Sequence, residues 1–107
     1  MAQTYKIVVT QRAQDSLELI VDYLREQSSD ETARKVRDAI EKAMADLARM
    51  PSAHGLLKGT KNSFIVYRRV LVWSYRIIYT IEEDELLVIV IDIDHESMNP
   101  VSLEDLP

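Results

Sequence analysis

One stretch decides the fold of this 107-residue sequence: Tyr67-Arg68-Arg69-Val70-Leu71-Val72-Trp73-Ser74-Tyr75-Arg76-Ile77-Ile78-Tyr79. Within it and just beyond it, side-chain character alternates with a period of two. One set of alternate positions is apolar or aromatic throughout: Trp73, Tyr75, Ile77, Tyr79 and Ile81. The other set is mixed: Ser74, Arg76, Ile78, Thr80 and Glu82. The alternation predicts a half-buried strand with one face covered by another layer and the Arg76 face left open. We look for function on that open face.

Two amphipathic helices precede this strand and can supply the cover. In Gln11–Gln27, apolar residues recur at three- and four-residue spacing, and Thr10 is placed to cap the first turn. The segment Ser28-Ser29-Asp30-Glu31 has the pattern of a capping box, in which Ser28 and Glu31 bind each other's backbone amides. It predicts a second helix that runs to about Met50, where Pro51 stops it. With so short a connection, the helices are expected to form an antiparallel hairpin.

Three further strands complete the predicted sheet. They cover Tyr5–Val9, Phe64–Val70 and Leu86–Asp94, and Glu82-Glu83-Asp84-Glu85 forms the turn before the last of them. The element order is β-α-α-β-β-β. The sequence therefore predicts an α+β fold in which a helical hairpin packs on one face of a mainly antiparallel sheet, as a single domain over residues 1–107.

A turn centred on Asp84 also fixes the register of the last hairpin, because side chains on one face must lie opposite side chains on the same face. The expected pairs are Ile81–Leu87, Tyr79–Ile89, Ile77–Ile91, Arg76–Asp92, Ser74–Asp94 and, roughly, Trp73–His95. A surface ion pair between Arg76 and Asp92 would contribute less than about 1 kcal/mol.

The composition excludes several classes of protein. There is no cysteine, so neither a disulfide framework nor a thiolate metal site is expected. His54 has no partner at metal-ligand spacing, and we expect no metal and no cofactor. No apolar run approaches the roughly 18 residues of a membrane span, and the N-terminus lacks the features of a signal peptide, so we expect a cytoplasmic protein.

Charge is unevenly distributed along the sequence, although the net charge is only -5. Residues 51–81 contain five basic residues and no acid, namely Lys58, Lys61, Arg68, Arg69 and Arg76. Residues 82–107 contain acids and no Lys or Arg. The basic stretch is compatible either with a solvated face or with a local, salt-sensitive surface for an anionic partner.

The sequence resembles the RelE/ParE superfamily of toxins from type II toxin–antitoxin systems. Besides the element order, the resemblance rests on short motifs: Pro51-x-x-x-Gly55, Tyr67-Arg68-Arg69, Tyr75-Arg76-Ile77-Ile78-Tyr79 and His95-Glu96-Ser97-Met98-Asn99. The second and last of these look like the ParE branch. That branch implies a plasmid-stabilisation toxin that inhibits DNA gyrase without chemistry of its own. It also implies a cognate antitoxin that wraps the helices and sheet, contact with DNA only through the antitoxin, and a homodimer or toxin–antitoxin hetero-oligomer.

Two other activities remain open under the same resemblance. The RelE branch cuts mRNA in the ribosome, and its catalytic residues would here be Arg69, Arg76 and His95. RNA cleavage needs a base, an acid and cations for the developing charge, whereas Glu96, Ser97 and Met98 stand where a nuclease would want basic residues. A third possibility is an inactive homologue that only binds antitoxin. Whether the chain is an enzyme is therefore open, with the balance against it.

The candidate binding residues fall into two groups. Arg68 and Arg69 should point to opposite faces of a strand, so at most one of them shares the face of Arg76. The resemblance favours Arg69 for that position. The proposed target contacts are Arg68, Arg69, Arg76, Lys58, Lys61, His95, Ser97, Met98 and Asn99. The apolar connection around Leu71, Val72 and Trp73 is unusual for a hairpin and suggests an exposed tip that the antitoxin or a second copy covers.

Overall fold

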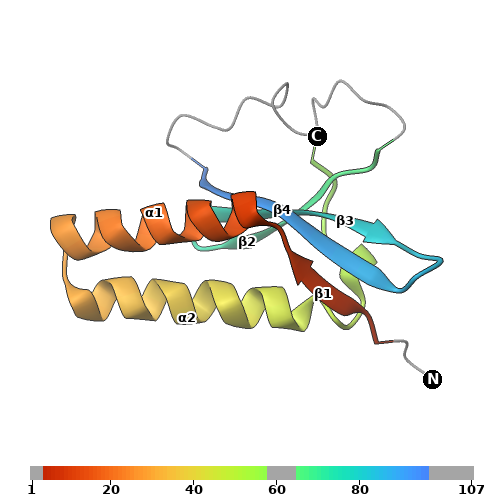
Figure 1. The fold of residues 1–107 in the computed structure, drawn as a ribbon, viewed down its shortest axis with the longest axis horizontal. Coiled ribbons are helices and arrows are strands. Elements are labelled where there is room, and N and C mark those ends of the chain that lie inside the picture. Colours follow the sequence, from red (N-terminus) through yellow and green to blue (C-terminus); the bar gives the residue numbers. More distant parts are fainter. Residues whose placement is uncertain (1–3, 58–64, 97–107) are drawn as a thin grey trace.

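The computed structural model describes residues 4–57 and 65–96, which form two helices on a four-stranded sheet (Figure 1). The elements in chain order are β1 (Lys6–Val9), α1 (Gln11–Gln27), α2 (Asp30–Asp46), the 3-10 turn η1 (Pro51–Ala53), β2 (Arg68–Val72), β3 (Tyr75–Glu82) and β4 (Leu87–His95). The strand order is β1-β4-β3-β2. β1 pairs with β4 in parallel and the other two pairs are antiparallel, so the predicted fold class is confirmed. Neither helix in these ranges is long and apolar enough to cross a membrane.

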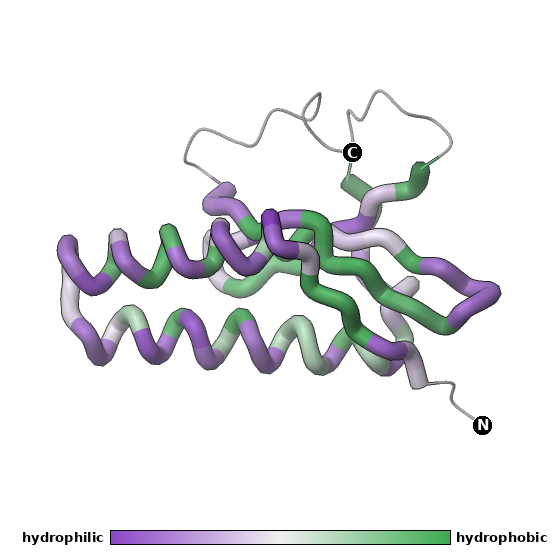
Figure 2. The backbone as a smooth tube through the Cα atoms, viewed as in Figure 1, coloured by the Kyte–Doolittle hydropathy of each residue, from purple (hydrophilic) through white to green (hydrophobic). Residues whose placement is uncertain are grey.

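Helix α1 begins and ends where the sequence predicts. The Thr10 side chain accepts a hydrogen bond from the Ala13 amide and so caps the first turn. The two helices lie side by side and antiparallel, joined by a short turn (Figure 1). Their apolar stripes meet the sheet in the main core, which includes Leu17, Val21, Ile40, Ile77 and Tyr79. Figure 2 shows these stripes as green bands alternating with hydrophilic turns along both helices.

Helix α2 departs from the prediction at both ends. Its N-cap is Ser29, which accepts from the Thr32 amide, whereas Ser28 belongs to the end of α1 and donates its backbone amide to Leu24 O. The capping box predicted for Ser28 and Glu31 is therefore wrong by one residue. The helix ends at Asp46 rather than near Met50, because the chain tightens into i→i+3 hydrogen bonds while Leu47 still packs into the core.

Strand β2 begins later than predicted, at Arg68 rather than Phe64. A two-residue loop, Trp73-Ser74, joins β2 to β3, and this short loop places Val72 opposite Tyr75 and Arg68 opposite Tyr79. Trp73 has a left-handed backbone (φ 53°), a conformation that a two-residue hairpin loop requires and that glycine or asparagine usually supplies. Phe64 lies outside the described residues.

The predicted register of β3 and β4 is wrong by two residues in its far half. The turn pairs Glu82 with Leu87, which shifts the register by one residue, and a β-bulge between Ile78 and Tyr79 shifts it by one more. The bulge leaves Ile91 as the extra residue on β4. Two single shifts restore the alternation of faces, so Arg76 still lies opposite an aspartate, but that aspartate is Asp94 instead of Asp92. Likewise, His95 lies opposite Tyr75 rather than Trp73.

The face of the sheet turned away from the helices is not fully open. Leu57, Tyr67, Ile78 and Ile91 form a second, smaller core there. Leu57 donates its amide to Tyr67 O, and Leu56 forms an isolated bridge with Arg68 at the start of β2. The segment after η1 therefore covers one end of this face, and the Arg76 end is left for the candidate site.

Candidate functional site

Arg76 is held by a carboxylate across the sheet. Its Nε donates to Asp94 Oδ1 at 2.8 Å and its Nη2 to Asp94 Oδ2 at 2.6 Å. The two side chains are only 16% and 8% exposed, so this is a mostly buried forked pair and not the surface pair that the sequence predicts. The hydrogen bond with Asp94 raises the pKa of the Arg76 guanidinium. The positive charge of Arg76 is therefore largely cancelled within the protein.

Arg69 lies on the same face as Arg76, as the family resemblance favours. It pairs with Ile78, two positions from Arg76 on β3. Its backbone amide donates to Gly55 O at 3.0 Å, and its Nη2 lies 3.9 Å from where a Cβ on Gly55 would be. No hydrogen bond or ion pair joins the Arg69 guanidinium to any other part of residues 4–57 and 65–96.

Arg68 lies opposite Tyr79 and binds backbone, not another charge. Its Nη1 donates to His54 O at 3.0 Å and to Ser52 O at 3.3 Å. Nearby, the Tyr79 hydroxyl donates to Pro51 O at 2.6 Å. Burial raises the pKa of Tyr79 to about 12, with the positive charge of Arg68 acting in the opposite direction. Arg68 and Tyr79 thus fasten the segment that follows α2 to the sheet.

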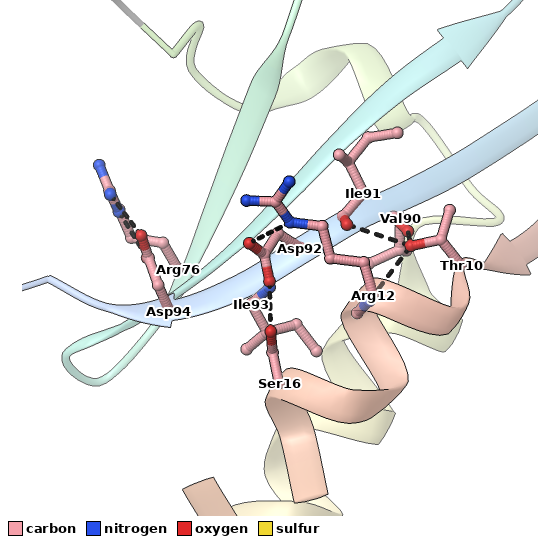
Figure 3. A network of polar contacts seen from close by, with 10 residues as sticks. Thr10, Arg12, Ser16, Arg76, Val90, Ile91, Asp92, Ile93 and Asp94 are labelled. Atoms are coloured by element: carbon pink, nitrogen blue, oxygen red, sulfur yellow. Dashed lines mark hydrogen bonds and ion pairs between the residues drawn. The ribbon is translucent and has the colours of Figure 1, made fainter. Parts of the chain in front are cut away.

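A polar network that the sequence reasoning missed joins α1 to the bulge of β4 (Figure 3). The side chain of Asp92 is almost fully buried and accepts from Ser16 Oγ at 2.6 Å, from Arg12 Nε at 3.0 Å and from the Ile93 amide at 2.7 Å.

The hydroxyl of Thr10 also reaches this region of β4. It donates to Val90 O at 2.8 Å and to Ile91 O at 3.0 Å, so the same residue caps α1 and holds the chain at the extra residue. An acid inside the apolar run Leu86–Ile93 is the signal that could have pointed to a buried partner.

His95 is not brought together with the two arginines. Its ring packs edge-on against Tyr75, with centroids 5.0 Å apart, and Tyr75 packs against the core under the helices. Because Arg76 is the neighbour of Tyr75 on β3, its side chain takes the opposite face. The three residues named for RNA cleavage therefore occupy two faces of the sheet.

The β2–β3 tip is apolar and exposed. Leu71 is 42% exposed and Trp73 60% exposed, while Val72 packs against the edge of the main core. The prediction of an exposed tip required that Trp73 not be buried within the monomer, and Trp73 is indeed exposed. Of the other predicted contacts, Lys58, Lys61, Ser97, Met98 and Asn99 lie outside the described residues.

Arg69, Arg76 and His95, the side chains named for RNA cleavage, do not form one cluster. Within residues 4–57 and 65–96, no group of three or more His, Asp or Glu side chains could hold a metal ion. Arg76 is neutralised, Arg68 binds carbonyls and His95 packs on a tyrosine. Among residues 4–57 and 65–96, the site offers Arg69, whose guanidinium has no hydrogen bond or ion pair within these ranges, on the same hairpin as the apolar tip.

One family model matches most of the sequence. Residues 7–100 match a family model described as the ParE toxin of type II toxin–antitoxin systems (parDE). A search of curated proteins found no match.

Similar solved structures come from both branches of the superfamily. A chromosomal ParDE system from P. aeruginosa has a TM-score of 0.69 at 16% identity, covering 86% of this chain and 96% of that one. A RelBE toxin–antitoxin complex from Mycobacterium tuberculosis has a TM-score of 0.59 at 22% identity, covering 87% and 92%. An archaeal RelE–RelB complex from Pyrococcus horikoshii OT3 has a TM-score of 0.62 at 11% identity, covering 91% and 100%. At these identities the similarity establishes the fold.

Proposed function

The chain belongs to the ParE toxin family of type II toxin–antitoxin systems, and from this premise we propose that it inhibits DNA gyrase by binding. A cognate antitoxin neutralises it in this proposal. The observation that carries the choice of binding over RNA cleavage is the Arg76–Asp94 pair. Cleavage of RNA builds negative charge on a phosphorane, and an arginine already neutralised by a buried carboxylate is poorly placed to stabilise it.

The target surface in this proposal is the sheet face that carries Arg69 and Arg76. The other predicted target contacts do not define this face, because His95 lies on the opposite face and Lys58, Lys61, Ser97, Met98 and Asn99 lie outside the described residues. Arg69 is its leading contact, because its guanidinium has no partner among the described residues and is therefore available to an anionic group. Arg76, fixed by Asp94, contributes shape more than charge.

The test is expression of the chain from a tightly controlled promoter without antitoxin, following DNA-damage signalling and protein synthesis together. Gyrase inhibition predicts damage signalling and filamentation while translation continues, and a resistant gyrase should restore growth. Arrested translation with mRNA cut at the ribosome would instead establish the RelE-type activity. A folded protein that causes neither response would be an inactive homologue that only titrates antitoxin.

A matched pair of variants locates the target surface. Arg69→Met should reduce growth inhibition at least about tenfold in the inducer concentration required, since it removes one charge-assisted contact. Arg34→Met is the control, because Arg34 is an exposed arginine on α2, away from the proposed surface. Equal toxicity of the two variants would remove Arg69 from the target surface.

The antitoxin contact in this proposal includes the tip, Leu71, Val72 and Trp73. Two of these apolar side chains are exposed at the end of a rigid hairpin, as expected of an interface anchor. Trp73→Gly removes the indole while suiting the left-handed backbone, so the fold should persist. Leu86→Gly is the matched control, because Leu86 has the same φ of 53° in the other hairpin turn. We expect Trp73→Gly alone to weaken antitoxin binding, by about 30-fold or more.

A further inference from the structure

Several contacts fasten the Pro51–Leu57 segment to the sheet. At its start, Pro51 is buried and its carbonyl accepts from the Tyr79 hydroxyl. At its end, the Leu57 amide donates to Tyr67 O. Between these anchors, the carbonyls of Ser52 and His54 point to one atom, Arg68 Nη1. Arg68 supplies the side-chain hydrogen bonds that the structure shows to the middle of the segment.

The same segment lies against the side chain of Arg69. Gly55 O accepts from the Arg69 amide, and a Cβ on Gly55 would lie 3.9 Å from Arg69 Nη2, which is ordinary van der Waals distance. Arg68 and Arg69 are neighbours on β2 whose side chains leave the strand on opposite faces, yet both meet this one segment. The middle of the segment is thus a physical link between them, through His54 O on one side and Gly55 on the other.

We infer that Arg68 is a positioning residue, which holds the Pro51–Leu57 segment in place and thereby orders the Arg69 guanidinium, and that it does not itself contact the target. The Arg68 guanidinium directs its Nη1 donors at two carbonyls of the Pro51–Leu57 segment and is therefore turned toward its own chain. An Arg69 kept in one orientation would lose less conformational freedom on binding, which raises affinity without any new contact. This inference rests on the proposed function for its biological readout, but its structural claim can be measured without it.

Loss of Arg68 should loosen the segment without unfolding the protein. Strand β2 pairs with β3 through backbone hydrogen bonds that do not involve this side chain, and the Tyr79 and Leu57 anchors remain. Arg68→Met should therefore lower Tm by no more than about 5–10 °C. Arg68→Lys keeps a donor that can reach carbonyl oxygen, and should restore part of the order.

The decisive measurement is NMR relaxation of the Arg69 side-chain Nε–H in purified protein, comparing wild type, Arg68→Met, Arg68→Lys and the control Arg34→Met. We expect the Arg69 order parameter to fall below about 0.6 in Arg68→Met, to be intermediate in Arg68→Lys, and to be unchanged in Arg34→Met. Growth inhibition should fall in the same order.

Two outcomes would overturn the inference. If the order parameter of Arg69 is unchanged in Arg68→Met but toxicity is lost, Arg68 is a direct target contact. Arg69 order and toxicity both unchanged would leave it without a positioning role. If Arg68→Met does not fold, the same comparison is decided by Arg68→Lys and by hydrogen exchange at the Arg69 amide. If wild type fails to inhibit growth, the proposed function fails while the relaxation result still decides the role of Arg68.

Discussion

The Arg76–Asp94 pair should stabilise the fold far more than an exposed ion pair does. Exposed pairs contribute about 0.2–1 kcal/mol, whereas breaking a fully buried pair costs about 3–5 kcal/mol. With side chains 16% and 8% exposed and two short hydrogen bonds, this pair lies between those limits. We expect a coupling energy of about 1.5–3 kcal/mol. Each kcal/mol lost should lower Tm by about 4 °C in a chain of this size.

A double-mutant cycle measures this coupling directly. Arg76→Met, Asp94→Asn and the double variant are unfolded in urea, at low salt and at 1 M NaCl. Most of the coupling should persist at high salt, since buried charges are screened much less than exposed ones.

The matched control is Arg37–Glu18, which has the same 2.6 Å contact with side chains 30% and 57% exposed. Its coupling should stay under about 1 kcal/mol and decrease with salt. A coupling for Arg76–Asp94 no larger than the control would refute the claim that Arg76 is neutralised within the fold.

Three further predictions follow from single contacts. Because the folded state raises the pKa of Tyr79 from 10.0 to about 12, stability present below pH 10 should be lost between pH 10 and 12, by at most about 3 kcal/mol. Tyr79→Phe should not show this loss of stability at alkaline pH when its unfolding by urea is measured. If the wild type and Tyr79→Phe lost stability in parallel as the pH rises, the prediction would be wrong. Ser29→Ala should lower the free energy of unfolding by about 1 kcal/mol because it removes the N-cap of α2, and Ser28→Ala should lower it much less. Equal losses in thermal unfolding would mean that Ser28 contributes to the cap as the sequence predicts. Asp92→Ala should lower the free energy of unfolding by about 3 kcal/mol, because it leaves buried donors unpaired. The control Asp38→Ala, at an exposed position, should lower it by less than about 0.5 kcal/mol. A similarly small loss for Asp92→Ala would mean that the α1–β4 network contributes little to stability.

The elements were predictable from sequence wherever the determining contacts are local. Helix α1 is an example, because its cap, Thr10, immediately precedes the seventeen residues that carry its apolar stripe. Strand alternation alone predicts that Arg68 and Arg69 point to opposite faces. The choice of Arg69 for the face of Arg76 came from the family resemblance, and the pairing of β2 with β3 confirms it. The cap of α2 was missed because the box pattern is met only at Ser28, three residues before Glu31, whereas the observed cap is Ser29, which accepts from the Thr32 amide.

The register and the partner of Arg76 could not be predicted for a physical reason. The bulge at Ile91 is held by Thr10, which lies about 80 positions away in the sequence, and Asp92 is held by Ser16 over a similar separation. An extra apolar residue in an already apolar strand leaves no mark on the local pattern. The strand therefore looks regular in sequence, and only the docking of α1 decides where its alternation breaks.

The parallel pairing of β1 with β4 has a consequence for how the protein folds. The first strand hydrogen-bonds to the last strand of the sheet and to no other described strand. The sheet therefore cannot be completed until β4 has been synthesised, and the part of the helical apolar stripe that packs on β4 stays uncovered until then. Pairing over such a sequence distance is slow, because the conformational entropy of closing a long loop is lost before the strand contacts contribute any stabilisation. The nascent chain thus passes through a period in which a chaperone or a binding partner can reach surfaces that the finished fold conceals.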